Sequence, residues 1–255
     1  RLYKLDSSGT LIWDYFTDTY PSGVIWTKPL LSPDGNTVFI GELSGQVHAV
    51  DAATGRRLWA RRLGGSVVSS IAMGMFGELF VGSFDGKVYA LAPEDGTVFW
   101  DFQTLGLIYG SPAICENGDL VTGSSDGAVY RLTRFGKRVW SYYMDAPTKS
   151  SPIIGPHGCT YIGNQNGKLY CISPEGRRVW SYHTNPDMPE NDINSSPSLG
   201  PDGTVYFGST TGEVFAIPAD HFYKNRTDAA LDLNPAHDGE TPDIPPGGAT
   251  VVFMD

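Results

Sequence analysis

The sequence predicts an all-β protein, a β-propeller of four-stranded antiparallel blades. Tryptophan recurs at spacings of 46, 41, 40 and 40 residues, and a glycine stands four positions before each tryptophan. A period of about 40 residues filled by short strands and turns is typical of propeller blades. The two ladders are Trp13, Trp59, Trp100, Trp140 and Trp180, and Gly9, Gly55, Gly96, Gly136 and Gly176.

Each repeat is interpreted as four strands joined by turns. A pair such as Ser111-Pro112 precedes a short apolar run, and a turn such as 200–203, Gly-Pro-Asp-Gly, follows the run. Proline presets φ in such a turn and glycine accepts positive φ. The second strand ends on a glycine, as in 204–208, the third alternates, as in 87–91, and the fourth carries the tryptophan, as in 177–182. No stretch shows the helical period of 3.6 residues.

These repeats define the expected domain organisation. Residues 1–218 form the propeller, 219–248 form a Pro/Asp/Gly-rich insertion, and 249–255 form a closing strand that we expect to complete the last blade. Within the insertion, 232–239 has partial similarity to a calcium loop but carries two extra residues, so a solvated loop is the alternative. The repeats cover 1–15 (a blade remnant), 27–59, 69–100, 110–140, 150–180 and 195–218.

One motif resembles a known family. Residues 49–59, Ala-Val-Asp-Ala-Ala-Thr-Gly-Arg-Arg-Leu-Trp, resemble the tryptophan-docking motif of pyrroloquinoline quinone (PQQ) repeats, Ala-x-Asp-x-x-Thr-Gly-x-x-x-Trp. Residues 90–100 keep the spacing, whereas the copies ending at Trp140 and Trp180 are one residue shorter and keep only the glycine and the tryptophan. The superfamily includes quinoprotein alcohol dehydrogenases, a lipoprotein of bacterial outer-membrane barrel assembly and other extracellular proteins. Because the motif is structural in all of them, the resemblance implies a fold and no activity.

Blade number gives a further expectation. The chain supplies five nearly complete blades and one partial blade, whereas the resemblance implies a ring of about seven or eight blades. We therefore expect the missing remainder of the same protein to complete the ring, with a shortened ring as the alternative. In either arrangement each tryptophan is expected to pack between adjacent blades, where its large ring is buried and its N–H finds an acceptor.

Charge and hydropathy narrow the classes of partner. The chain has 18 Lys and Arg against 28 Asp and Glu, for a net charge of −10. This balance argues against binding to nucleic acid or to an anionic membrane surface, because phosphates require a basic footprint. No apolar run approaches the roughly 20 residues that span a bilayer. The resemblance alone implies a secreted or periplasmic location.

The residues expected at the propeller axis argue against an enzyme. Aligned repeats place five side chains just before the inner strands, and this set holds one cation and no carboxylate, which is poor for the Ca²⁺ that holds PQQ. The histidines show no metal-ligand or triad spacing, and the cysteines form no adjacent pair. We predict no catalytic, cofactor-binding or metal residues and no cofactor. The five side chains are Trp26, Val68, Tyr109, Lys149 and Asn194.

The predicted function is a non-catalytic binding or scaffolding propeller outside the cytoplasm. Trp26, Tyr109, Lys149 and Asn194 at the axial mouth are candidate binding residues, and the unequal connections 14–25 and 183–193 are a candidate partner surface. The expected partner is a protein or the missing remainder of the chain, and glycan binding stays open. A PQQ-dependent dehydrogenase and a structural subunit of an extracellular assembly are the alternatives. A disulfide between Cys159 and Cys171 also stays open.

Overall fold

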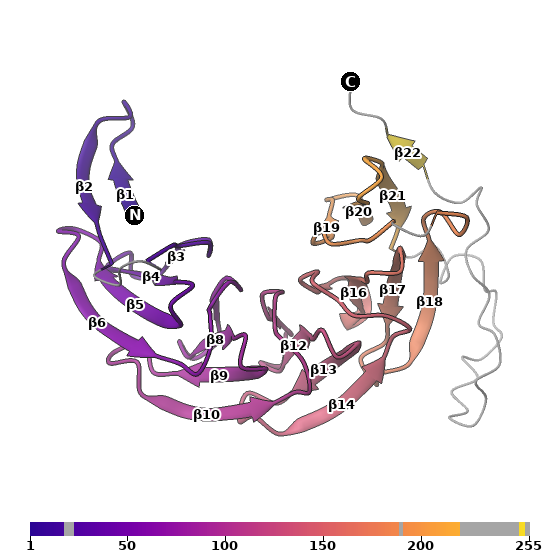
Figure 1. Cartoon of the computed structure of the whole chain (residues 1–255), viewed down its shortest axis with the longest axis horizontal. Coiled ribbons are helices and arrows are strands. Elements are labelled where there is room, and N and C mark those ends of the chain that lie inside the picture. The colour runs from indigo at the N-terminus through magenta and orange to yellow at the C-terminus, as the bar shows by residue number, and fades with distance from the viewer. Residues whose placement is uncertain (18–22, 189–190, 220–249, 253–255) are drawn as a thin grey trace.

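The computed structural model describes residues 1–17, 23–188, 191–219 and 250–252. Across these ranges the strands form five four-stranded sheets and one two-stranded hairpin, with a single short 3-10 turn, η1 (Pro156–Gly158). The sheets lie side by side in an open crescent, with β2, β6, β10, β14 and β18 along the convex edge (Figure 1). This arrangement confirms the predicted all-β architecture of four-stranded antiparallel blades.

Each sheet is a meander in which every strand pairs with the next one along the chain. The strands are, in the N-terminal hairpin, β1 (Leu2–Leu5) and β2 (Leu11–Tyr15); in blade 1, β3 (Leu30–Leu31), β4 (Thr37–Gly41), β5 (Gln46–Asp51) and β6 (Arg57–Arg62); in blade 2, β7 (Ala72–Met73), β8 (Leu79–Gly82), β9 (Lys87–Leu91) and β10 (Val98–Gln103); in blade 3, β11 (Ala113–Ile114), β12 (Leu120–Gly123), β13 (Ala128–Leu132) and β14 (Arg138–Tyr143); in blade 4, β15 (Ile153–Ile154), β16 (Thr160–Gly163), β17 (Lys168–Ile172) and β18 (Arg178–His183); and in blade 5, β19 (Ser198–Leu199), β20 (Thr204–Gly208), β21 (Val214–Pro218) and β22 (Thr250–Val252).

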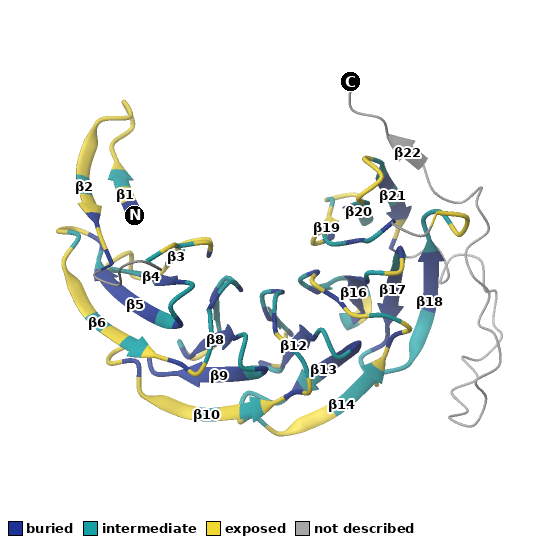
Figure 2. Ribbon diagram, in the orientation of Figure 1, coloured by how far each residue is buried: buried dark blue, intermediate teal, exposed yellow. Residues whose placement is uncertain are grey.

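The hydrophobic core consists of clusters that two consecutive blades share. Phe39 and Val47 of blade 1 pack with Leu79 and Leu91 of blade 2, and the same arrangement recurs between blades 2 and 3, 3 and 4, and 4 and 5. The two middle strands of each blade are the most buried, whereas β2, β6, β10 and β14 are largely exposed (Figure 2). Because a blade buries its faces only against its neighbours, the stability of each blade depends on the blades beside it.

A β-bulge precedes each tryptophan of the ladder. In every outer strand from β2 to β18, one residue has no partner in the register, and the tryptophan follows it directly. A bulge of this kind bends the strand locally and changes the direction of the next side chain. The bulge residues are Ile12, Leu58, Phe99, Val139 and Val179.

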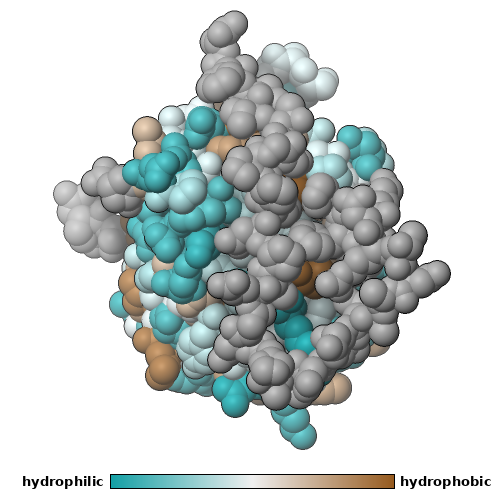
Figure 3. All heavy atoms as spheres, turned by 90° about the vertical axis from the view of Figure 1, so that its right-hand side faces the viewer, coloured by the Kyte–Doolittle hydropathy of each residue, from teal (hydrophilic) through white to brown (hydrophobic). Residues whose placement is uncertain are grey.

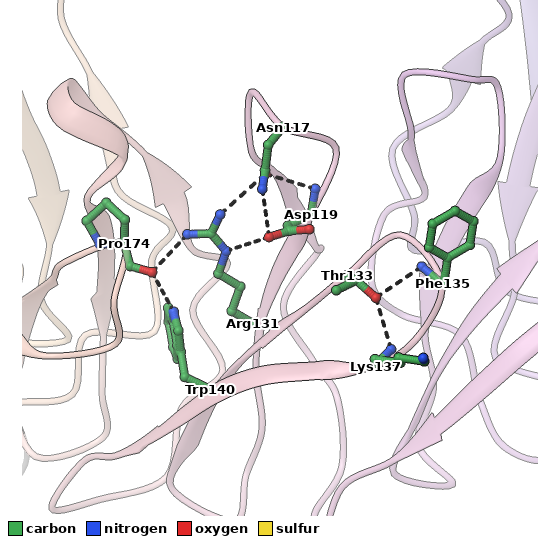
Figure 4. A network of polar contacts seen from close by, with 8 residues as sticks. All are labelled: Asn117, Asp119, Arg131, Thr133, Phe135, Lys137, Trp140 and Pro174. Carbon is green, nitrogen blue, oxygen red and sulfur yellow. Dashed lines mark hydrogen bonds and ion pairs between the residues drawn. The ribbon is translucent and has the colours of Figure 1, made fainter.

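The tryptophans join each blade to the next. Four indole N–H groups donate to a backbone carbonyl in the following blade, on the turn that precedes its outer strand, and each ring lies against the glycine of that turn. Trp180 is buried and packs against Tyr161, with ring centroids 5.8 Å apart. The four bonds are Trp13 to Ala52 (3.2 Å), Trp59 to Pro93 (2.9 Å), Trp100 to Arg134 (2.8 Å) and Trp140 to Pro174 (2.8 Å, Figure 4), and the glycines are Gly55, Gly96, Gly136 and Gly176.

A second set of links runs through serine hydroxyls at the start of the inner strands. Along this row, a backbone N–H of one blade donates to the serine Oγ at the same position in the next blade. The serines of the Ser-Pro pairs therefore also accept a hydrogen bond from the backbone of the preceding blade. The four bonds are Lys28 to Ser70 (2.9 Å), Ser70 to Ser111 (2.8 Å), Ser111 to Ser151 (2.9 Å) and Ser151 to Ser196 (3.2 Å).

Blade 5 receives its fourth strand from beyond the insertion. β22 pairs with β21 in antiparallel register, with Val214 opposite Val252 and Ala216 opposite Thr250. The predicted insertion at 219–248, apart from Ala219, lies outside the described residues, and so does the calcium-loop hypothesis at 232–239.

Candidate functional site

The inter-blade loops and the turns between the second and third strands gather on one side of the crescent, which we call the loop face. Each of these turns donates a backbone N–H to the loop that enters its own blade: Leu43 to Val24 (3.0 Å), Phe84 to Ser66 (2.9 Å), Ser125 to Leu107 (2.9 Å), Gln165 to Pro147 (2.8 Å) and Thr210 to Asp192 (2.9 Å). Five repeated bonds hold these loops in fixed positions relative to the strands.

Two of the four candidate binding residues predicted at the axial mouth, Tyr109 and Lys149, lie together on this face. The Tyr109 ring packs against Phe84 with centroids 4.5 Å apart, and Lys149 Nζ lies 5.5 Å from the Tyr109 centroid. These side chains come from blade 2 and from the loops that enter blades 3 and 4. A tyrosine that contacts both an aromatic ring and an ammonium group combines an apolar body with a nearby positive charge.

The other two predicted residues lie on the loops that enter blades 1 and 5. Trp26 is 68% exposed. Asn194 Nδ2 donates to Asp192 Oδ2 at 3.3 Å, and Gln165 Nε2 donates to the same oxygen at 3.3 Å. Asn194 is thus joined to a carboxylate that the alignment of repeats did not include.

The sequence reasoning missed two exposed apolar residues on the same loop as Tyr109. Leu105 is 84% exposed, Leu107 is also exposed, and both lie on the loop between β10 and β11. The matching loop between β6 and β7 carries Gly64 and Ser66 at these positions. A comparison of equivalent loop positions between repeats could have identified Leu105 and Leu107 from the sequence. On the side of the crescent that bears β18 and β21, by contrast, hydrophilic residues predominate among those drawn in colour (Figure 3).

Two carboxylates of the loop face hold tyrosines. Tyr130 donates its hydroxyl to Asp126 Oδ2 at 2.7 Å, and Tyr89 donates to Asp85 in the same way. Burial, followed by the adjacent carboxylate, raises the pKa of both tyrosines well above the usual value. The two aspartates also accept backbone N–H groups of their own turns. Their role is therefore structural.

In blade 4 the carboxylate that holds the tyrosine comes from the preceding loop. Asp145 accepts hydrogen bonds from Tyr170, Lys168 and Asn164, each at 2.7 Å. Burial alone would raise the pKa of Asp145, but these three donors outweigh burial and lower the pKa to about 2.

The Asp145→Asn variant is expected to unfold at a lower temperature than the wild type at neutral pH. Because the folded-state pKa of Asp145 is depressed, its contribution is present above the ordinary value of 3.8 and is lost as the pH falls through about 2. Thermal unfolding at pH 7, 4 and 2 should therefore give a difference in Tm that shrinks with acid. Glu94→Gln, at an exposed carboxylate, is the control. A difference independent of pH would contradict this role.

The described residues offer little for catalysis. Across the part of the chain that the structure describes, no group of three or more His, Cys, Asp or Glu side chains is placed to hold a metal ion. Beside the axial residues, Asp192 is one carboxylate against the six to eight oxygens that Ca²⁺ takes, so this donor set does not fit Ca²⁺ and PQQ. Cys115, Cys159 and Cys171 are buried and form no disulfide, so Cys159 and Cys171 are not cross-linked in this structure. Among the described residues, no helix is long and apolar enough to cross a membrane.

Comparison with known proteins identifies the family. The family described as "Outer membrane protein assembly factor BamB" matches residues 1–76 and 69–240. The chain belongs to the BamB family. Membership confirms the PQQ-like repeat propeller predicted from the tryptophan motif. Among curated proteins, nothing matches the sequence.

A solved member of the BamB family shares the fold. The crystal structure of BamB from Moraxella catarrhalis matches with a TM-score of 0.67 at 21% sequence identity, over 83% of this chain and 65% of the Moraxella chain. At this identity the likeness establishes the β-propeller. The present chain thus spans less than two thirds of that BamB.

Proposed function

We propose that the chain is a non-catalytic scaffold that binds a protein partner through the loop face. The observation that carries the proposal is the group formed by Tyr109, Phe84 and Lys149. Leu105 and Leu107 are exposed on the same loop as Tyr109. Aromatic side chains are enriched at the energetic centres of protein interfaces. Loops fixed on a rigid scaffold are also where binding residues concentrate.

The polar groups of the loop face support a binding role over a catalytic one. Asp85, Asp126 and Asp145 each hold a tyrosine hydroxyl and are committed to that contact. A general base needs a reachable proton and a pKa near the working pH, and the pKa of Asp145 lies far below that range. The face therefore offers an apolar and aromatic surface with fixed charges around it.

The family supports the class of partner. Because the chain belongs to a family described as an outer membrane protein assembly factor, we propose that the partner takes part in outer-membrane protein assembly and that binding occurs outside the cytoplasm. A glycan partner stays a prediction from the sequence.

Site-specific photocross-linking tests the proposal. A photoreactive residue is placed at Tyr109 or Leu105, on the loop face, and as a matched control at Phe99, an exposed aromatic bulge residue on the outer strand β10. The variants are irradiated with detergent-solubilised outer-membrane proteins, and adducts are identified by mass spectrometry. We expect a discrete adduct from both loop-face positions and none from Phe99. Equal labelling from all three positions would contradict the proposal.

A second measurement separates the scaffold from a dehydrogenase. Titration with PQQ in the presence of Ca²⁺, followed by quinone absorbance and tryptophan fluorescence, is expected to show no saturable binding. Stoichiometric uptake of the quinone would overturn the non-catalytic assignment.

A further inference from the structure

Two phenylalanines and a methionine lie exposed on the side of the crescent opposite the loop face. This side carries the turns between the first and second strands and between the third and fourth strands, and we call it the turn face. Met75 and Phe76, on the turn between β7 and β8, are 61% and 70% exposed, and Phe135, on the turn between β13 and β14, is 70% exposed. The turn that carries Phe135 is shown in Figure 4.

An arginine joins the two aromatic rings. The Arg134 guanidinium carbon lies 3.6 Å from the Phe76 centroid and 5.0 Å from the Phe135 centroid. Glu78 fixes this arrangement, because one of its carboxylate oxygens lies 3.1 Å from Arg134 Nε and the other accepts the Phe76 backbone N–H at 3.0 Å. Met75, Phe76, Arg134 and Phe135 are called the Phe76–Phe135 cluster. The contacts of Glu78 restrain Arg134 and the Phe76 backbone before any ligand binds, which reduces the freedom that these groups lose on binding.

The fold does not require apolar residues at these positions, as the other repeats show. Five turns close with the same hydrogen bond from a glycine N–H to the residue three positions earlier. Their two middle residues are Pro33-Asp34, Glu116-Asn117, Pro156-His157 and Pro201-Asp202 in blades 1, 3, 4 and 5, against Met75-Phe76 in blade 2. Phe135 likewise stands where the matching turn of blade 4 has Glu175. At the Phe76 position every other copy is polar, and at the Met75 position the other copies carry proline or glutamate. Neighbouring large apolar side chains that are exposed only in this copy are typical of an interaction site.

Charge around the cluster indicates the chemistry of the partner. Exposed Glu94 and Asp95 follow Pro93, whose ring lies beside Gly77 of the Phe76 turn, and exposed Glu116 precedes Gly118, which lies beside Met75. Arg134 is paired with Glu78, and Arg61, which donates to the Gly96 carbonyl, acts on Asp95. The three carboxylates of Glu94, Asp95 and Glu116 therefore face two cations, Arg61 and exposed Lys137. Aromatic ring faces and carboxylates both attract cations, and guanidinium groups stack on such faces.

We propose that the Phe76–Phe135 cluster binds an arginine-containing peptide segment of a partner protein. Arginine side chains stack on the accessible faces of Phe76 and Phe135, extending the stack that Arg134 begins, and an aliphatic residue of the segment packs on Met75. The carboxylates of Glu94, Asp95 and Glu116 attract the flanking positive charges. This site is separate from the loop face and does not rest on the proposed function.

Fluorescence anisotropy with a defined probe tests this site. The probe is a fluorescein-labelled heptapeptide of alternating arginine and leucine, and the comparison peptide has glutamate in place of each arginine. We expect saturable binding of the arginine peptide, and affinity for the glutamate peptide at least about tenfold weaker. The double variant Phe76→Ser and Phe135→Ser should bind the arginine peptide about tenfold more weakly than the wild type, in line with two lost stacking contacts.

Two controls separate this site from general attraction to an acidic chain. The double variant keeps every charge, so unspecific electrostatic binding would survive in it unchanged, and that result would overturn the proposal. Trp26→Ser, on the loop face, should bind the peptide within twofold of the wild type, and an equal loss there would also overturn it. Because both rings lie on exposed turns, the double variant is expected to unfold near the wild-type Tm. That result would show that the affinity is lost with the two rings and not through unfolding.

Discussion

Gly136→Ala is expected to lower the free energy of unfolding by about 3 kcal/mol, from a strained backbone and a forced contact. Gly136 has φ of +78°, a region that alanine enters only at a cost. An added Cβ would also lie 2.6 Å from Cδ2 of Trp100. The ring would have to move away from the turn to which it donates its hydrogen bond at Arg134. Urea denaturation followed by tryptophan fluorescence measures the loss.

Gly203→Ala is the matched control for this change. Gly203 has φ of +76°, almost the same backbone conformation, but an added Cβ there meets no atom within 4 Å. Only the conformational cost of about 1–2 kcal/mol should remain. The difference between the two variants isolates the contact with Trp100. Equal losses would show that the indole does not dock on Gly136 as described.

Replacing Glu42 by alanine is expected to destabilise the protein by about 2–4 kcal/mol, because it removes a buried carboxylate that Ser44 and His48 both contact. Glu42 and His48 are both buried, and Glu42 Oε1 lies 3.4 Å from His48 Nε2. Ser44 donates its hydroxyl to the same carboxylate oxygen, and a 2.9 Å hydrogen bond joins His48 Nδ1 to the Tyr15 hydroxyl. The network connects blade 1 to the N-terminal hairpin, so thermal unfolding should report its loss directly.

Glu42→Gln tests whether the loss comes from the acceptor. Glutamine keeps the shape and an oxygen that can accept from Ser44 and His48, so a smaller loss than that of Glu42→Ala is expected. If both variants unfold at the wild-type temperature, the carboxylate contributes nothing to stability and the interpretation of the network is wrong.

The sequence allowed the fold to be predicted because its signal is repeated. One tryptophan is weak information, but Trp59, Trp100 and Trp140 recur with glycines at a fixed offset. The repetition reveals a constraint that acts in every blade. The structure adds what the pattern could not contain: the glycine lies beneath the tryptophan of the preceding blade, about 36 residues earlier. The spacing within one repeat does not indicate that the glycine contacts the tryptophan of the preceding blade.

The candidate site was less predictable because its residues depart from the repeat. The alignment placed Tyr109 and Lys149 near the axis, but Phe84, which packs on Tyr109, belongs to a turn of another blade. Likewise, His48 stands where the third strands of blades 2, 3 and 4 carry tyrosine, and only the structure shows the Glu42 carboxylate beside it. Contacts between different blades depend on the curvature of the crescent, and no short-range pattern encodes that curvature.

The serine links have a consequence for how such proteins change over time. Blades 1 to 4 are each held to the next described blade by the same two contacts where both are seen: an amide donates to a serine hydroxyl, and, between blades 1 and 2, 2 and 3, and 3 and 4, an indole donates to a carbonyl beside a glycine. The contacts from blade 3 to blade 4 are therefore of the same two kinds as those from blade 2 to blade 3. Duplication or deletion of a whole unit in the gene would leave every remaining junction chemically intact. The number of blades can therefore change in such repeats without a new kind of contact between them.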